Sequence, residues 1–255
     1  MSLRCVYTDL DGTLLGRGAS LFHDADGSFT LLAGRALEAC HRAGVEVVPI
    51  SGRRRGQVAE PARLLGATAY CFEIGGGLVI DGEETWLCGE YQPRDGLTPW
   101  QLIDRSGAPA LLLDTYTGVL EPHSPWHLGR EVTHLFRGLV DVAEANALLV
   151  DNGHTGVRLL DNGTIDAQRR CYHLAPTTAS KAAAVAAHMQ ARGYAATDCI
   201  AVGDSREDSE VAPAVGHLFL VANADPDLPA GPNTTRTEAS HGAGFYEAVV
   251  QSLVA

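Results

Sequence analysis

Asp9 and Asp11 lie two residues apart at the end of a short apolar run, in the stretch CVYTDLDGTLLG. Residues i and i+2 of an extended chain point to the same side, so both carboxylates would face one space. Two unit charges about 4 Å apart repel by roughly 4 kcal/mol at an effective dielectric constant of ~20. Such a pair indicates acid–base or nucleophilic chemistry or a bound cation. Taken alone, D-L-D-G-T also fits a strand followed by a solvated Asx turn.

Three further groups of polar residues follow apolar runs or open a helix. The sequence Ser51-Gly52-Arg53 follows VVPI, and Lys181 follows Thr-Thr-Ala-Ser at the start of an alanine-rich stretch. Asp204 and Asp208 follow IAV in the segment GDSRED. The carboxyl ends of parallel strands meet at one edge of a sheet, where ligands bind. We therefore expect four aspartates, a serine and one or two cations around a single crevice.

The elements that must position these residues alternate between strands and helices. Short apolar, β-branched runs predict strands at 4–9, 45–50, 70–74, 199–203 and 217–222. Helical spacing of apolar residues predicts helices at 31–43 and 181–192, each followed by a glycine, and a last helix near 244–253. A helix at 57–65 is less clearly indicated because Pro61 interrupts it. Strands that alternate with helices predict an α/β fold with a Rossmann-like, mostly parallel sheet.

A second unit is predicted between Ser51 and Lys181. The 130 positions that separate them are far more than one crossover needs, whereas the roughly forty residues between Asp9 and Ser51 leave no room for a domain. Residues 83–175 read as an inserted α+β domain, with a helical pattern near 128–136 and a hairpin turn at Asp161-Asn162-Gly163. The predicted core is then formed by residues 1–82 and 176–255.

The ordered set D-x-D-G-T, S-G-R, a lone lysine and G-D-S-x-x-D resembles the haloacid dehalogenase-like (HAD) phosphatase superfamily. The place of the insertion is similar to the subgroup with a second-position cap, which includes sucrose-phosphate, trehalose-phosphate and mannosyl-3-phosphoglycerate phosphatases. The resemblance implies a Rossmann-like core and an α+β cap that selects the substrate. Two positions depart from the usual pattern: Glu207 stands where relatives often carry asparagine, and Glu73-Ile74-Gly75 stands where they often read E-N-G.

The resemblance also implies a role for each residue of the set. Asp9 is the expected nucleophile, and Asp11 the general acid that then acts as base. Ser51, the main-chain N–H of Gly52 and Lys181 are expected to hold the phosphate, and Arg53 is expected to reach the substrate. The expected metal ligands are Asp9, Asp204, Asp208 and the main-chain carbonyl of Asp11. Ligands that are all oxygen favour Mg²⁺ over zinc.

The function expected from this set is that of a Mg²⁺-dependent phosphatase. It would hydrolyse a small phosphorylated metabolite, with a sugar phosphate as the expected substrate, through an aspartyl-phosphate. A phosphotransferase of the phosphomannomutase type shares this core chemistry and stays open as an alternative. A non-catalytic phosphometabolite-binding protein is disfavoured because Asp9 and Asp11 are both present. Candidate cap contacts are His154, Arg158, Arg169, Arg170 and His173, although each is more simply interpreted as an ordinary surface or structural residue.

The composition of the chain limits the kinds of molecule that it is expected to bind. The chain of 255 residues has a formal net charge of −12, which argues against binding to nucleic acid or to an anionic membrane surface. A small anionic substrate is compatible with this charge, because a metal or a few cations can reverse the field inside a cleft. The six cysteines form no C-x-x-C pair, the first residues lack the apolar segment of a signal peptide, and no apolar run approaches the roughly 18 residues of a membrane span. We therefore predict a cytoplasmic protein; the oligomeric state is not predicted.

Overall fold

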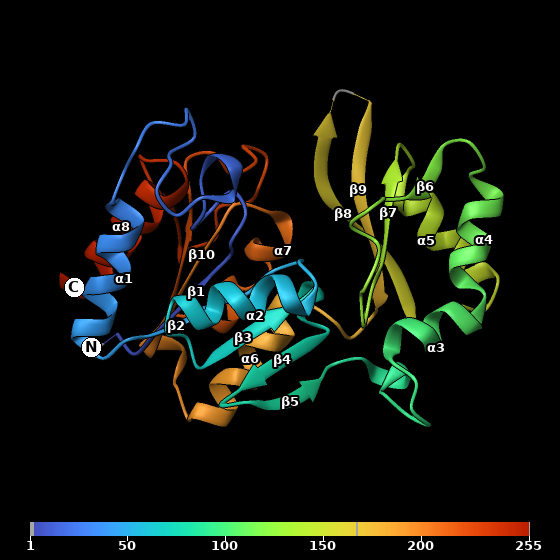
Figure 1. Ribbon diagram of the computed structural model, residues 1–255, viewed down its shortest axis with the longest axis horizontal. Helices are drawn as coiled ribbons and strands as arrows, with labels where there is room; N and C mark the ends of the chain where they lie inside the picture. Colours follow the sequence, from blue (N-terminus) through green and yellow to red (C-terminus); the bar gives the residue numbers. More distant parts are fainter. Residues whose placement is uncertain (1–2, 167, 255) are drawn as a thin grey trace.

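The computed structural model describes residues 3–166 and 168–254. Its main sheet has five parallel strands (Figure 1). In their order across the sheet they are β12 (Thr234–Arg236), β11 (His217–Leu220), β10 (Cys199–Gly203), β1 (Cys5–Thr8) and β2 (Glu46–Pro49). The predicted α/β fold with a parallel sheet is confirmed.

Helices cover both faces of this sheet. They are α1 (Leu32–Ala43), α2 (Arg55–Leu64), α6 (Lys181–Arg192), α7 (Arg206–Ser209) and α8 (His241–Val254). Val6 of β1 and Val47 of β2 belong to the core that includes α1 and α8, whereas Tyr7 and Val48 belong to the core that includes α6. Because neighbouring residues of a strand point to opposite faces, burial on both sides requires continuous apolar runs. This requirement is why the central strands could be predicted.

The ends of two core helices are determined by local sequence. Helix α1 ends at Gly44, whose φ of 69° lets its N–H bond to the carbonyls of Cys40 and His41. Helix α6 begins after Ser180, whose side chain accepts a hydrogen bond from the N–H of Ala183. This cap fixes Lys181 as the first residue of α6. Both predicted helices are confirmed to within one residue.

A second, antiparallel sheet continues from the edge of the first. Its strands are β3 (Ala69–Phe72), β4 (Gly77–Ile80) and β5 (Glu83–Trp86). A parallel bridge between Ile50 and Cys71 joins β3 to the end of β2. Helix α2 crosses between β2 and β3, with Pro61 inside it, so the helix that the proline left in doubt does form.

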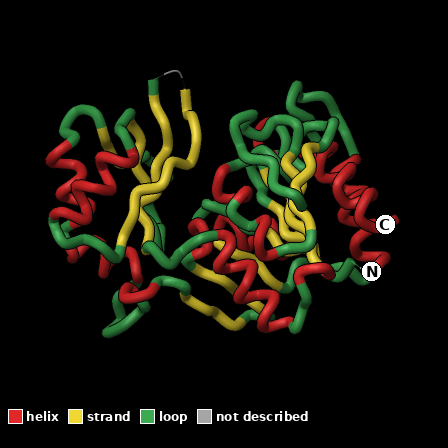
Figure 2. Tube along the Cα trace, turned by 180° about the vertical axis from the view of Figure 1, so that it is seen from behind, coloured by secondary structure: helices red, strands yellow, loops and turns green. Residues whose placement is uncertain are grey.

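A third, antiparallel sheet forms the part of the molecule farthest from the termini (Figures 1 and 2). Its strands, in order, are β6 (Leu120–Pro122), β7 (His134–Gly138), β9 (Arg169–Pro176) and β8 (Val157–Asp166). Helices α3 (Pro99–Ser106), α4 (Ala108–Thr115) and α5 (Val142–Asp151) lie on its outer side (Figure 1). We call this sheet and its helices the cap sheet unit. Strand β5 falls within the predicted insertion 83–175 but pairs with β4, and the two-domain division itself stays a prediction.

Two predictions inside this region are wrong. The helix predicted near 128–136 does not form: β7 begins at His134, and the preceding N–H groups of Glu131, Val132 and Thr133 donate to the Glu73 carboxylate instead of to helical carbonyls.

The predicted hairpin turn at Asp161-Asn162-Gly163 is a bulge inside β8. The side chain of Asp161 accepts a hydrogen bond from the N–H of Gly163, and the register with β9 shifts between Asp161 and Thr164. A single-residue irregularity of this kind uses the same turn-forming residues without reversing the chain.

Five short 3-10 segments complete the described structure: η1 (Arg17–Ala19), η2 (Glu73–Gly75), η3 (Gly89–Tyr91), η4 (Ala196–Asp198) and η5 (Ala212–Ala214). Among the described residues, no helix is both long enough and apolar enough to cross a membrane.

Candidate active site

The carboxyl edge of the main sheet carries the aspartates that the sequence singled out. Asp9 follows β1 and extends its pairing, since its N–H donates to the carbonyl of Val202 on β10 at 3.0 Å. Asp204 follows β10, and Asp208 lies on α7 directly after it. A Cβ at Gly12, whose φ is +83°, would come within 2.4 Å of Asp204 Oδ2. The glycine of D-x-D-G-T is therefore required both by its backbone conformation and by the closeness of Asp204.

Lys181 bridges two of these aspartates. Its Nζ lies 2.7 Å from Asp9 Oδ1 and 2.8 Å from Asp208 Oδ1, and all three side chains are buried. Burial lowers the pKa of Lys181, but Asp208 and Asp9 outweigh it, so the pKa lies well above its usual value. The ammonium group is therefore a fixed positive charge beside Asp9.

The carboxylates of Asp9, Asp204 and Asp208 each place an oxygen within 4.8 Å of the others. Burial, and then the charge of Asp208, raises the pKa of Asp204 to about 6. Burial also raises the pKa of Asp9 well above its usual value, against the effect of Lys181. The buried carboxylates of Asp9 and Asp208 and the half-buried carboxylate of Asp204 form an all-oxygen donor set, with one ammonium group beside it. Such a set fits a hard divalent cation, so the residues present could hold a metal ion.

The side chain of Asp208 is held in place by Ser205, the residue that precedes α7. Its Oδ2 accepts hydrogen bonds from the N–H and hydroxyl of Ser205 at 3.1 and 2.6 Å, while Ser205 Oγ accepts from the N–H of Asp208. This capping box leaves Oδ1 for Lys181. Glu207, the residue that departs from the family pattern, is buried, and burial raises its pKa.

The Asp11 side chain belongs to a different pair. Arg53 donates from Nε to Asp11 Oδ2 at 2.6 Å and from Nη2 to Oδ1 at 2.5 Å. The Asp11 carboxylate therefore lies outside the group formed by Asp9, Asp204 and Asp208. This arrangement is compatible with the prediction that Asp11 would reach a metal only through its main-chain carbonyl.

The loop after β2 brings Ser51, Gly52 and Arg53 to the same edge. The N–H of Ser51 donates to Cys71, and its carbonyl accepts from Ile74, so two neighbouring segments fix the loop. Ser51 Oγ accepts from the N–H of Arg53 at 3.2 Å. The structure thus brings all eight predicted site residues to one edge of the sheet.

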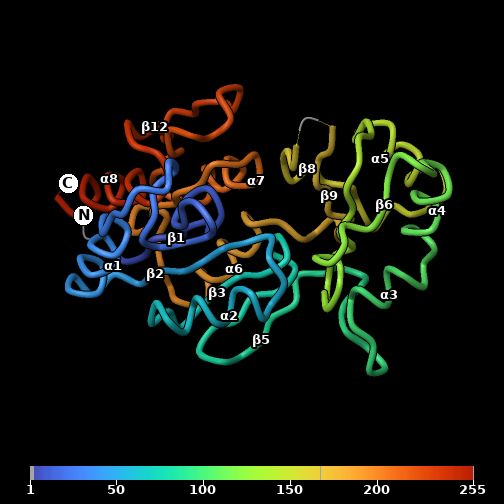
Figure 3. The backbone as a smooth tube through the Cα atoms, turned by 45° about the horizontal axis from the view of Figure 1, so that its top comes forward, coloured from blue at the N-terminus to red at the C-terminus, as the bar shows by residue number. Residues whose placement is uncertain are grey.

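A cavity of about 620 Å³ separates this edge from the cap sheet unit. Figures 1 and 3 show the end of β10 and α7 opposite β8 and β9. The core contributes Asp9, Asp11, Ala19, Ser51, Gly52, Arg53, Gln57, Lys181, Asp204 and Ser205 to its walls, and the cap sheet unit contributes His123, Trp126, Arg130, Leu135, Asn162, Cys171 and His173.

Sequence reasoning missed most of the wall on the cap side. Among the described residues, His173 is the one candidate cap contact that lines the cavity. Arg169 and Arg170 pair with Asp166 and Asp161, and Arg158 donates to the carbonyl of Ala179. His123, Trp126 and Arg130 lie in a loop between β6 and β7, and no motif in the sequence marks them.

Arg130 and Glu73 connect the cap sheet unit to the loop after β2. Arg130 donates from Nη1 and Nη2 to the carbonyl of Gly52 at 3.2 and 3.3 Å, and from Nη1 to Thr133 Oγ1 at 3.0 Å. Its Nη1 also lies 3.6 Å from Glu73 Oε2. Burial lowers the pKa of Arg130, against the effect of Glu73. The group is a buried cation held between two segments, not a freely moving one.

His173 extends this network into the cavity. Its Nδ1 lies 3.0 Å from Thr133 Oγ1, and its Nε2 lies 3.4 Å from the position of a Cβ built on Gly52. Burial, and then Arg130 and Lys181, lower the pKa of His173 well below its usual value. A neutral imidazole therefore faces the loop that carries Ser51.

A family model and several known proteins match this chain in sequence. A family model described as haloacid dehalogenase-like hydrolase matches residues 156–244. The phosphoglycolate phosphatase of Methanothermobacter thermautotrophicus is 25% identical over 97% of both chains. That of Halobacterium salinarum is 36% identical over 104 residues, which are 41% of this chain and 42% of that protein.

The fold has close counterparts among solved structures. The sucrose-phosphatase of Synechocystis, in complex with sucrose and phosphate, superposes with a TM-score of 0.73 at 16% identity, covering 99% of this chain and 98% of that one. This likeness confirms the predicted architecture. The family match over residues 156–244 and the fold agree with the resemblance to the haloacid dehalogenase-like hydrolases, and the full-length relatives carry the name of a phosphatase.

Proposed function

We propose that the chain is a Mg²⁺-dependent phosphatase that hydrolyses a small phosphorylated metabolite through an aspartyl-phosphate on Asp9. The observation that carries this proposal is the double contact of Lys181 with Asp9 and Asp208, at 2.7 and 2.8 Å, in the wall of the cavity. Asp9, the proposed nucleophile, thus lies beside a fixed cation and the carboxylates of the proposed metal site. Phosphate monoesters require up to about 10²¹-fold acceleration, so a site for them needs all three.

In the first proposed step, an Asp9 carboxylate oxygen attacks phosphorus and the bond from phosphorus to the leaving oxygen breaks. Asp11 gives its proton to that oxygen, so the product leaves as an alcohol. Lys181, Ser51 and the N–H of Gly52 would hold the phosphoryl oxygens. Arg53 must exchange Asp11 for the substrate or share both, because its guanidinium is bound to Asp11 through two hydrogen bonds.

In the second step, Asp11 accepts a proton from water, whose oxygen attacks phosphorus. The bond from Asp9 to phosphorus breaks, which releases inorganic phosphate and regenerates Asp9. Asp9, Asp204, Asp208 and the Asp11 carbonyl would hold Mg²⁺, which would neutralise the carboxylates and the phosphate dianion. Without a cation, several aspartates and a dianion in one cavity repel one another strongly.

Two classes of substrate are the first to test. A sugar phosphate is the class that the cap position predicts, and the sucrose-phosphatase shares the fold. A short phosphorylated hydroxy acid is favoured by the full-length relatives, which carry the name phosphoglycolate phosphatase. The cap side of the cavity offers His123, Arg130 and His173. We propose that this wall, within the predicted cap of residues 83–175, selects the leaving group.

The test is phosphate release from a panel of sugar phosphates, phosphoglycolate, phosphoglycerates and nucleotides, with Mg²⁺ and with EDTA. We expect turnover with Mg²⁺, none with EDTA, and none in Asp9→Asn, which keeps the shape of the side chain but removes the nucleophile. A panel without any turnover would overturn the proposal. Asp9→Asn with full activity would leave the phosphatase class intact but remove Asp9 as nucleophile.

Phosphoryl transfer to a second sugar is the alternative that shares these steps. Incubation with labelled phosphomonoester and unlabelled acceptor sugar separates the two reactions. Label in inorganic phosphate supports hydrolysis, whereas label in the acceptor supports a mutase or transferase. Tight binding without turnover across the panel would instead indicate a phosphometabolite-binding protein.

A further inference from the structure

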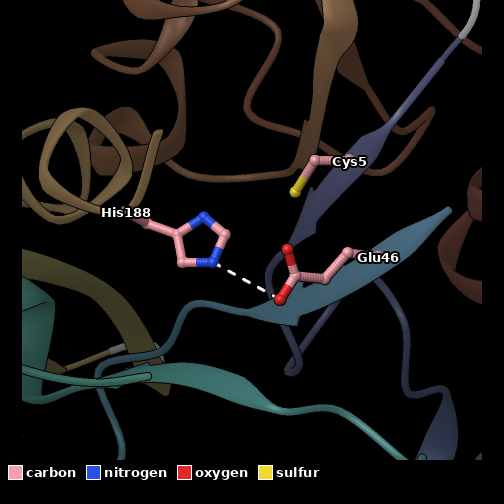
Figure 4. A group of neighbouring side chains, drawn as sticks. All are labelled: Cys5, Glu46 and His188. Carbon is pink, nitrogen blue, oxygen red and sulfur yellow. Dashed lines mark ion pairs between the residues drawn. The ribbon is translucent and has the colours of Figure 1, made fainter. Parts of the chain in front are cut away.

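A second group of ligand-type side chains lies at the opposite edge of the main sheet from the cavity. Cys5 is the first residue of β1, Glu46 is its register partner on β2, and His188 lies on α6 above them. One ligand atom from each, the thiol sulfur, a carboxylate oxygen and an imidazole nitrogen, lies within 4.8 Å of the others. Figure 4 shows the three side chains pointing toward one another.

We propose that Cys5, Glu46 and His188 form a zinc site that is separate from the site at Asp9. A set of one sulfur, one nitrogen and one oxygen is a donor set that zinc accepts, whereas Mg²⁺ takes oxygen ligands. Cys5 and His188 are fully buried, and Glu46 is half-buried beside a surface depression lined by Thr68, Arg192 and other residues. Glu46 therefore lies on the side from which an ion would enter.

The imidazole of His188 is prepared to coordinate a cation. Its Nδ1 lies 2.8 Å from the hydroxyl of Tyr7, while its Nε2 is buried without a hydrogen-bond partner among the described residues. When Nδ1 carries the proton and donates to Tyr7, Nε2 presents its lone pair. A metal-binding histidine commonly donates its other ring N–H to a second group in this way.

The competing arrangement has a proton on Nε2 that points toward Glu46. Nε2 lies 3.5 Å from Glu46 Oε1, which is longer than the usual 2.7–3.2 Å of an N–H···O bond. A contact of this length leaves the buried nitrogen without a good partner. Coordination to a metal would give Nε2 a partner, whereas a proton on Nε2 would still lack a good acceptor.

Tyr7 also connects His188 to the thiol. Burial and the neighbouring Cys199 raise the pKa of Cys5 well above its usual value, while the nearby hydroxyl of Tyr7 acts in the opposite direction. A hydroxyl that accepts from His188 has its own proton available for the sulfur. Tyr7 would thus stabilise the thiolate and fix the imidazole in the same geometry. A thiol that coordinates a cation loses its proton outright, so binding should release a proton from Cys5.

The charges of the three proposed ligands would neutralise a divalent cation. A thiolate and a carboxylate together cancel the two positive charges of zinc. Arg192 lies 3.0 Å from Glu46 Oε1, but its charge is matched by Asp81, which it contacts at 2.5 and 3.0 Å. Burial raises the pKa of Glu46, yet the nearby His188 and the hydrogen bonds from Tyr194 and Arg192 lower it to about 2. Glu46 is therefore ionised and oriented before any ion arrives.

The expected consequence of such a site is a more stable fold. It would join β1, β2 and α6, and these elements carry Asp9, the Ser51 loop and Lys181 at their other ends. The ion would hold the ends of the two strands against α6, far from the reacting atoms. We therefore expect zinc to raise the stability of the fold and to leave the chemistry of the cavity unchanged.

The test uses the full chain, stripped with EDTA and returned to excess Mg²⁺ so that the aspartates of the cavity are occupied. Titration with Co²⁺ should give a near-ultraviolet thiolate-to-cobalt charge-transfer band that saturates at one equivalent. Zn²⁺ at about 100 times its Kd should raise the melting temperature by roughly 5 to 10 °C. Cys5→Ala should abolish the band and the shift, and Cys40→Ala, which removes a buried thiol from α1, should keep both.

Three results would overturn the proposal. The first is a wild-type cobalt spectrum without a thiolate band. The second is a band that persists in Cys5→Ala. The third is a band that is lost in Cys171→Ala, since Cys171 lines the cavity and would then be the ligand. If Cys5→Ala fails to fold, X-ray absorption of the zinc-loaded wild-type chain decides, because a zinc shell without sulfur excludes Cys5.

Discussion

Arg53 binds the carboxylate of Asp11 through two hydrogen bonds, from Nε at 2.6 Å and from Nη2 at 2.5 Å. Burial lowers the pKa of Arg53, but Asp11 outweighs it and the pKa is raised, so the guanidinium stays charged in the cavity. The same fork that fits a carboxylate also fits a phosphate. Arg53 thus holds the proposed general acid at the place where, in our proposal, the substrate phosphate binds.

Arg53→Ala should weaken substrate binding more than it slows the chemical step. Loss of a charged hydrogen bond costs about 1.5–3 kcal/mol, which corresponds to a rise in KM of roughly 10- to 100-fold. Arg53→Lys keeps the charge but not the fork, and we expect an intermediate KM. Steady-state kinetics check this, with Arg63→Ala on the exposed side of α2 as control. An unchanged KM in Arg53→Ala would mean that the guanidinium serves Asp11 alone.

Lys181 is the single lysine of the chain. Lys181→Met would leave the buried carboxylates of Asp9 and Asp208 without their cation, and breaking a buried pair destabilises by about 3–5 kcal/mol. Activity should fall roughly 10²- to 10³-fold, as expected for one lost electrostatic contact to the transition state.

Thermal unfolding and phosphate release measure the two effects of Lys181→Met. Mg²⁺ should recover part of the stability, because in our proposal it binds the same carboxylates, but not the activity. Lys181→Arg, which keeps the charge, is the matched control for stability. A Lys181→Met protein as active as wild type would remove Lys181 from the proposed mechanism.

The Asp204 carboxyl makes stability depend on pH. Its pKa of about 6 in the folded, metal-free chain lies above the usual value of 3.8. Between these values the folded state holds a proton that the unfolded state lacks, so the free energy of unfolding falls as pH rises toward 6. Metal binding to Asp204 requires the ionised form. We therefore expect Mg²⁺ to stabilise strongly above pH 6 and progressively less below it.

Melting curves from pH 4.5 to 8, in EDTA and in Mg²⁺, measure this dependence. The two sets should diverge as pH rises through about 6. In Asp204→Asn the divergence should shrink, because one ligand and its titration are both absent. Parallel curves at all pH values for the wild type would contradict a role for Asp204 in metal binding.

The sequence predicted the core well because each strand is buried on both faces and must be apolar throughout. Asp9, Ser51 and Asp204 could be placed at one edge since parallel topology brings strand ends together. The residues on the cap side of the cavity could not be predicted, because their contacts join residues that are far apart in the sequence. Arg130 donates to the carbonyl of Gly52, which lies 78 positions earlier in the sequence. The carboxylate of Glu73 accepts hydrogen bonds from the N–H groups of residues 131–133, which prevents the helix that the spacing of these residues predicted.

Glu73 couples the cap sheet unit to the proposed phosphate loop. Its carboxylate accepts from the N–H groups of Glu131, Val132 and Thr133 at 2.8, 3.1 and 2.7 Å. Its own N–H donates to the carbonyl of Arg53 at 2.9 Å, and the side chain is fully buried. Glu73→Gln preserves size but replaces one accepting oxygen by an amide that only donates. At least one buried N–H then lacks an acceptor.

We expect Glu73→Gln to lower the free energy of unfolding by about 1–3 kcal/mol. The value of kcat/KM should fall roughly tenfold, because the loop and the cap strand lose their common anchor and small misplacements are costly in a reacting site. Thermal melts and steady-state kinetics measure both, and Glu83→Gln on exposed β5 is the matched control. A lower melting temperature with unchanged kcat/KM would show that Glu73 supports the fold alone. Loss of kcat/KM together with stability, absent in Glu83→Gln, would show that the cap sheet unit holds the loop in its working position.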